Sequence, residues 1–159
     1  MPSQRKRKTL PLGAPWLRKQ LLLPLPTEYI RDLSLANHLA LVGCRKDVGL
    51  KHSLNELIRL AYLSFFLWDA GYGAEEPTLF LDAERALDSA VVRAGETGKW
   101  QLEDNEFELM KRVVAVHDEQ LSSVTGQNYI AARQRLEALL RVPQTVSPIQ
   151  KRCLEHATH

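Results

Sequence analysis

The sequence has few of the residues from which covalent or metal-held frameworks are built. Its two cysteines, Cys44 and Cys153, lie far apart and match no metal-binding or redox spacing such as Cys-x-x-Cys. The sequence therefore gives no indication of a secreted disulfide scaffold. It also lacks a phosphate-binding glycine loop, a zinc signature and a nucleophile elbow, so we predict no catalytic residue, no metal and no other cofactor.

Long hydrophobic runs are missing as well. The longest apolar stretch extends from Leu60 to Trp68, is interrupted by Ser64, and is about half of the roughly 20 residues needed to cross a bilayer. The leucine-rich segment 21–25 is cut by Pro24 and is too short for the apolar part of a signal peptide. We therefore expect no membrane association, and a cytoplasmic protein, most simply a bacterial one.

Acidic side chains are absent from the first 27 residues, although the whole chain of 159 residues has a net charge of only +2. Residues 28–74 are neutral, residues 75–119 carry twelve acids against five bases, and residues 120–159 carry a net +3. The small average charge therefore hides a basic arm attached to an acidic body. The six basic residues of the arm are Arg5, Lys6, Arg7, Lys8, Arg18 and Lys19.

Five of the eight prolines fall within residues 1–26, a composition that resists regular helix and offers little to bury. We interpret this segment as an extended or disordered arm in which only Trp16, Leu17 and residues 21–23 are expected to dock. The predicted organisation is then the arm (1–26), one helical domain (27–141) and a short, flexible polar tail (142–159).

Apolar residues recur at helical spacing in five segments, and no pair of alternating strands is visible. Because short glycine breaks favour antiparallel neighbours, we predict an all-α, single-domain bundle of four to five helices. The expected helices are 27–43, 53–70, 79–94, 103–124 and 128–141.

The predicted helix ends follow from local signals. Ser53 and Glu56 match a capping box, which places the start of the second helix at Ser53. Glycine tolerates the left-handed conformation that ends a helix, so Gly71 should end the second helix, and Gly95 and Gly98 the third. The fourth helix has the strongest period, with apolar or aromatic residues and one histidine at alternating spacings of three and four: Phe107, Met110, Val114, His117, Leu121 and Val124.

His117 is the titratable residue of greatest interest because it occupies this seam. A catalytic base or ligand is one interpretation, but a core histidine satisfied by one polar neighbour is favoured. A di-metal bundle would need Glu-x-x-His, and Leu35 and Val114 stand where glutamate is required before His38 and His117. A phosphotransfer domain would need a lysine after its histidine, and His38 has none. An enzyme is therefore the third alternative.

The start of the fourth helix is acidic, with Glu103, Asp104, Glu106 and Glu108. Unpaired backbone amides and the helix dipole favour negative charge there, which is a sufficient structural explanation. The functional alternative is an acidic patch for a basic partner, or for the chain's own arm.

The second helix is apolar nearly all round between Leu60 and Trp68, which is typical of a helix at the centre of a fold or at a subunit interface. The first functional hypothesis is accordingly a small non-enzymatic regulatory or adaptor protein that acts by protein–protein contact, as a homodimer and with another protein. The candidate interface residues are Tyr62, Phe66, Trp68, Tyr72 and Trp100.

The alternative is an accessory DNA- or RNA-binding regulator whose arm neutralises phosphates without sequence preference. Arg45, Lys46 and Lys51, in the loop before the second helix, are expected to assist if they face the same side as the arm. That loop is longer than the tight turn of a helix-turn-helix, so this motif is disfavoured. The arm could equally be a solvated tail, or fold onto the acidic residues of its own chain.

Overall fold

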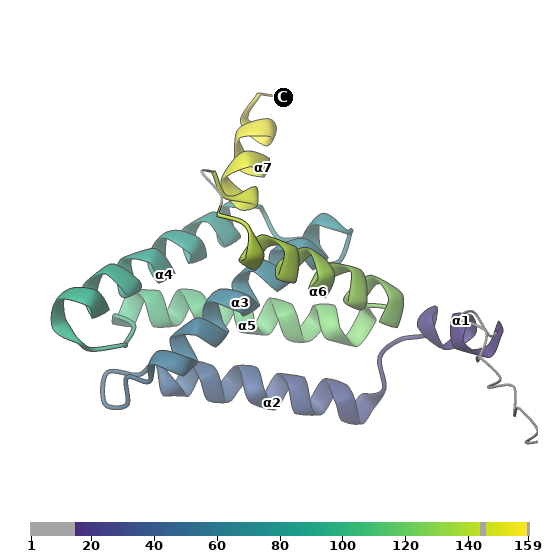
Figure 1. Ribbon diagram of the computed structural model, residues 1–159, viewed down its shortest axis with the longest axis horizontal. Coiled ribbons are helices and arrows are strands. Elements are labelled where there is room, and N and C mark those ends of the chain that lie inside the picture. The colour runs from purple at the N-terminus through teal and green to yellow at the C-terminus, as the bar shows by residue number, and fades with distance from the viewer. Residues whose placement is uncertain (1–14, 144–145, 159) are drawn as a thin grey trace, which may run out of the picture.

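The computed structural model describes residues 15–143 and 146–158, and this part of the chain is all-helical (Figure 1). The prediction of an all-α class is confirmed, whereas the count of four to five helices is wrong, because one further helix lies in each of the segments interpreted as arm and tail. The described residues form seven helices: α1 (Pro15–Leu21), α2 (Thr27–Gly43), α3 (Lys51–Asp69), α4 (Thr78–Thr97), α5 (Asp104–Ser123), α6 (Gly126–Arg141) and α7 (Pro148–Ala157).

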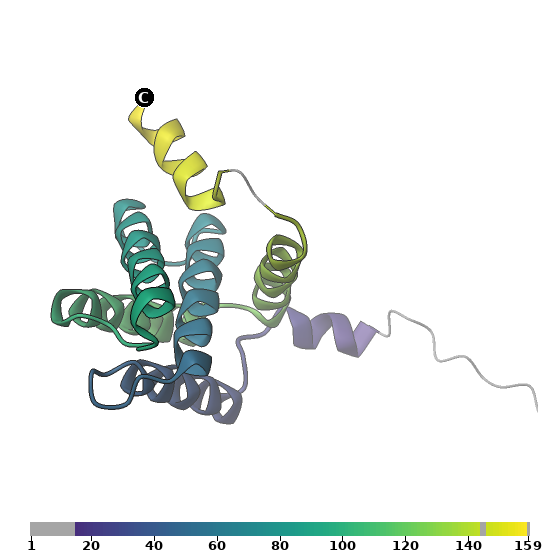
Figure 2. The same cartoon turned by 60° about the vertical axis from the view of Figure 1, so that its left-hand side comes forward.

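Helix α3 lies at the centre of the fold and contacts α2, α4, α5 and α6 (Figures 1 and 2). Its side chains Leu54, Leu57 and Leu67 are fully buried, and Phe65 is nearly so. Between Leu60 and Leu67 the four surrounding helices leave only Tyr62 partly exposed, which explains why this part of the sequence is apolar nearly all round.

The predicted capping box at Ser53 is wrong. Helix α3 begins two residues earlier, at Lys51, after Leu50, and no side chain caps it. Ser53 is instead buried within the helix, where it lies against Gly43 at the end of α2. The capping box of this fold is at the start of α5, where Glu103 and Glu106 each accept a hydrogen bond from the other's backbone amide.

The other helix ends and buried faces agree with the sequence pattern except for the end of α4 and one buried position of α6. Helix α4 continues through Gly95 and ends before Gly98, whose φ of 71° is left-handed. In α6, Leu140 is exposed, and Leu139 packs against the core after Ala132 and Leu136. The seam of α5 is confirmed, since its members are buried apart from the half-buried Phe107.

Helices α1 and α7 are held against the rest of the fold; docking was predicted for Trp16, Leu17 and residues 21–23 of the arm, but not for the tail. Helix α1 packs near the start of α6, where the Gly126 amide donates a hydrogen bond to the Leu23 carbonyl at 3.0 Å. Helix α7 replaces the expected flexible tail: it packs on α4, buries Ile149 fully and places Ser147 Oγ 2.9 Å from Glu84 Oε2. The first four basic residues of the arm lie outside the described residues.

Candidate functional site

A buried glutamine joins the two most buried helices of the bundle. Gln120 of α5 accepts a hydrogen bond from Ser64 Oγ of α3 at 2.7 Å. Its amide nitrogen donates to the Ser64 carbonyl at 2.9 Å and to the Tyr72 carbonyl at 3.0 Å. One side chain therefore fixes α5 against both α3 and the loop that follows α3, and the amide cannot turn over without losing these bonds.

His117 lies one turn before Gln120 and is 1% exposed. Burial lowers the pKa of its imidazole to about 4, so the ring is neutral at pH 7. Its Nδ1 lies 3.3 Å from Gln120 Oε1, and an amide oxygen can only accept a hydrogen bond. The structure thus confirms the prediction of a core histidine with one polar neighbour.

A narrow cleft of about 170 Å³ opens among α2, α3, α5 and α6, and His117 lines it. Leucine side chains form its walls, and charged groups of α3 and α6 stand around it. Of these, Arg59 is already engaged, because its Nη2 lies 2.6 Å from Glu137 Oε1. The remaining polar groups that line this histidine cleft are Asn37, Glu56, Tyr129 and Arg133.

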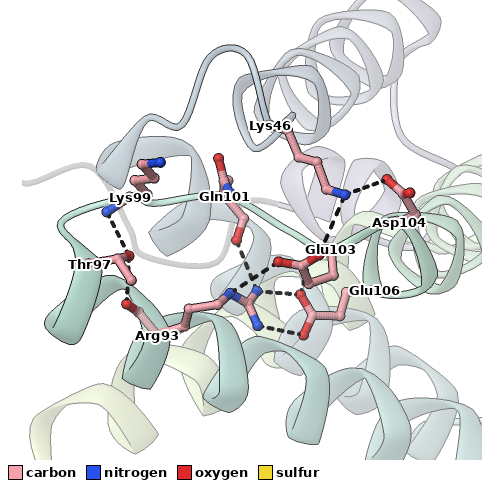
Figure 3. A network of polar contacts seen from close by, with 8 residues as sticks. All are labelled: Lys46, Arg93, Thr97, Lys99, Gln101, Glu103, Asp104 and Glu106. Carbon is pink, nitrogen blue, oxygen red and sulfur yellow. Dashed lines mark hydrogen bonds and ion pairs between the residues drawn. The ribbon is translucent and has the colours of Figure 1, made fainter.

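The acidic start of α5 belongs to an internal ion-pair network (Figure 3). Arg93 of α4 holds Glu106 through two hydrogen bonds, of 2.7 and 3.2 Å, and this pairing raises the pKa of the guanidinium. Lys46 lies 3.5 Å from Glu103 and 3.2 Å from Asp104. The network ties α4, α5 and the loop after α2 together, so these acids have structural partners.

The structure separates the two described basic residues of the arm from those of the loop. Arg18 and Lys19 are exposed on α1, next to the start of α2, whereas the loop follows the end of α2. Helix α2 has 17 residues, a length of about 25 Å at 1.5 Å per residue. The loop cations also have partners of their own: Arg45 pairs with Asp47, Lys46 with the α5 acids, and Lys51 lies over the Trp100 ring.

The five aromatic candidates for an interface are engaged within the fold. Phe66 is 3% exposed beneath the Arg135 guanidinium, and Trp68 stacks on Phe65. The Tyr62 hydroxyl donates to Glu84 at 2.6 Å, and the Tyr72 hydroxyl accepts from Asn128 at 2.7 Å. Trp100 lies beneath Lys51, and Phe66 and Trp68 both contact Phe65, so these rings already have partners within the fold.

The outer face of α2 carries an apolar stripe that the sequence reasoning missed. Leu35, Leu39 and Val42 are 57%, 60% and 47% exposed, at spacings of four and three residues. The signal was present in the sequence: once the inward residues of this helix are assigned, these three remain as a second series at heptad spacing. We call this surface the α2 stripe.

A comparison with known proteins finds no family model, no curated protein and no solved structure that matches this chain. Among the described helices, none is long and apolar enough to cross a membrane. Within residues 15–143 and 146–158, no three His, Cys, Asp or Glu side chains come together as metal ligands.

Proposed function

We propose that this chain is a small, non-enzymatic, cytoplasmic regulatory or adaptor protein that acts by protein–protein contact and pairs with a second copy through the α2 stripe. The observation that carries the proposal is the exposure of Leu35, Leu39 and Val42 at heptad spacing on one helix. Isolated exposed leucines are common on protein surfaces, but such a series is the pattern by which helices pair.

A second copy fits this stripe because the surface can pair with itself. A two-fold interface brings the same patch together from both subunits, and a two-fold axis perpendicular to α2 makes the two helices antiparallel, with their dipoles opposed.

The expected affinity is low. A contact between two helices of about 25 Å falls below the roughly 1,200 Å² of a standard interface. We therefore expect a dissociation constant in the micromolar range, which suits a regulatory protein whose pairing responds to concentration or to a further partner.

Leu39→Lys should abolish dimerisation, because it buries a charge at the centre of the stripe. Sedimentation or light scattering over increasing concentration should show the wild-type mass rising above 18.1 kDa while the variant remains there. Val92→Lys is the matched control, since Val92 is 63% exposed on α4, outside the stripe. A wild-type protein that stays monomeric, or a Leu39→Lys variant that pairs like the control, would contradict the proposal.

A second candidate function is sequence-independent binding of DNA or RNA through the arm. It is favoured by Arg18 and Lys19, which are exposed on α1 and have no ion pair among the described residues. The acids at the start of α5, by contrast, have partners in Arg93, Lys46 and Lys111, which leaves less reason for the arm to fold onto them.

Replacing Arg5, Lys6, Arg7 and Lys8 by glutamine should weaken binding of duplex DNA and flatten its salt dependence. Each phosphate contact contributes about 0.9 to the slope of log K against log salt, so the loss of four should reduce the slope by about 3 to 4. Fluorescence anisotropy at several salt concentrations measures this slope. A control with Lys99 and Arg112 replaced by glutamine should bind unchanged, and equal slopes for all three proteins would refute the role of the arm.

A further inference from the structure

We propose that the histidine cleft is a binding site for a small organic monocarboxylate that also carries an O–H or N–H donor. The site is formed by α2, α3, α5 and α6 and is independent of both the α2 stripe and the arm. In this proposal His117 accepts the ligand's O–H or N–H, Arg133 binds its carboxylate, and leucine side chains of the same lining contact its body.

The tautomer of His117 follows from the orientation of Gln120. The amide nitrogen of Gln120 donates to the carbonyls of Ser64 and Tyr72, so the amide oxygen is the atom that faces the imidazole. Because an oxygen of this kind only accepts, Nδ1 of His117 must carry the proton. Its Nε2 is therefore an unprotonated hydrogen-bond acceptor.

This acceptor has no hydrogen-bond partner among the described residues. Although His117 is only 1% exposed, its side chain belongs to the lining of the cleft. An unpaired acceptor in the lining of a cleft that also has leucine walls favours a ligand that donates a hydrogen bond to it.

The charged side chains around the cleft indicate which group the other end of the ligand carries. Arg59 is occupied by Glu137, whereas Arg133 has no ion pair among the described residues, so its planar fork is free for a carboxylate. Glu56 lies in the same lining and disfavours a second negative charge. The ligand is thus a monoanion.

The size and walls of the cleft limit the body of the ligand. A volume of about 170 Å³ is smaller than a drug-sized pocket and corresponds to roughly six waters of about 30 Å³ each. Leu33, Leu60 and Leu136 provide apolar walls for one ring or a short carbon chain. 4-Hydroxybenzoate has these properties: a carboxylate, a flat apolar body and a hydroxyl donor at the opposite end.

The test is a titration of the isotope-labelled full-length protein with 4-hydroxybenzoate at pH 7, followed by NMR. We expect saturable amide shifts in the four helices around the cleft, a shift of the His117 Nε2 resonance, and a dissociation constant in the millimolar range. 4-Methoxybenzoate lacks the donor and should bind at least about tenfold more weakly, because the buried acceptor is then left unpaired.

Two variants assign the two ends of the ligand. Arg133→Gln should weaken binding of 4-hydroxybenzoate but not of the uncharged 4-hydroxybenzamide, while His117→Leu should remove the preference for the hydroxyl over the methyl ether. Arg112→Gln, an exposed arginine of α5 outside the cleft, is the control. Absence of saturable binding, equal affinity for the hydroxyl and methoxy compounds, or shifts that avoid the cleft would overturn the proposal. The ligand comparison needs no variant, so it remains decisive if His117→Leu does not fold.

Discussion

Replacing Gly43 by alanine is expected to destabilise the protein by about 3 kcal/mol, an unusually large effect for the addition of one methyl group. A Cβ atom at this position would lie 2.0 Å from Ser53 Oγ and 2.7 Å from Ser53 Cβ. Both distances are far below van der Waals contact, so the end of α2 would have to move away from the start of α3. Urea denaturation followed by circular dichroism measures the loss.

Removing the side chain of Ser53 should relieve the clash, so a double variant tests whether this contact is the cause of the lost stability. In the Ser53→Gly background both opposing atoms are gone, and Gly43→Ala should cost little or nothing there. In the Ser53→Ala background the 2.7 Å contact with Cβ remains, so relief should be partial. Equal costs of Gly43→Ala in the wild-type and Ser53→Gly backgrounds would contradict this account.

Gly95→Ala provides a control with the opposite sign. Gly95 lies inside α4, and nothing within 4 Å would meet an added Cβ. Alanine loses less backbone entropy than glycine on entering a helix, so this variant should be more stable by about 0.5–1 kcal/mol. The Gly43 variant therefore measures the effect of packing on stability, and the Gly95 variant measures the effect of backbone conformational preference.

The same pair, Gly43 and Ser53, shows why part of the fold could not be predicted from local patterns. The sequence around Ser53 satisfies the capping-box rule, but the side chain is needed where α2 and α3 meet, and the helix starts earlier. Packing between segments has overridden a local signal. The heptad of α5 was predicted correctly because one continuous buried face suffices to define it.

Helices α1 and α7 show the same limit of prediction from local sequence patterns. The start of α7 has a capping serine, Ser147, followed by Pro148 at the first helical position, yet its surroundings are polar and favour a tail. Its docking depends on Ile149 and on Glu84, which lies more than 60 residues earlier in the chain. Helix α1 likewise depends on the connection between α5 and α6. Such contacts between distant segments cannot be predicted from local sequence patterns.

The candidate site, too, could be predicted only in part from the sequence. That His117 is interior follows from its seam position, but its partners do not follow from the sequence. Gln120 was outside the predicted seam, and the groups that hold it, Ser64 and Tyr72, are 56 and 48 residues away. The cleft requires four helices to be in place, and its arginine, Arg133, lies on the exposed side of the predicted α6 pattern.

The burial of His117 should make the stability of the protein fall steeply in mild acid. Its pKa is lowered to about 4 in the folded state, against about 6.5 in an unfolded chain. Between these two values the unfolded state binds the proton and the folded state does not, so the free energy of unfolding decreases as the pH falls through this range. Above about pH 6.5 the imidazole is neutral in both states, and this contribution is constant.

The expected loss from this one residue, relative to pH 7, is about 2 kcal/mol at pH 5 and about 3 kcal/mol at pH 4. The charged groups near the ring include Glu56 at the cleft and Asp118, whose charge partly opposes the shift of the His117 pKa. His117→Leu isolates the histidine, because these groups are common to both proteins and cancel in the difference between the two unfolding curves.

His117→Leu should therefore retain its fold near pH 7, where leucine replaces one weak hydrogen bond by apolar burial, and should lose much less stability than the wild type by pH 5. His52→Gln is the matched control, since His52 is exposed in the first turn of α3 and its replacement should leave the wild-type pH dependence unchanged. Parallel pH profiles for His117→Leu and the wild type would show that the pKa of the imidazole is the same in the folded and unfolded states, and would contradict this prediction.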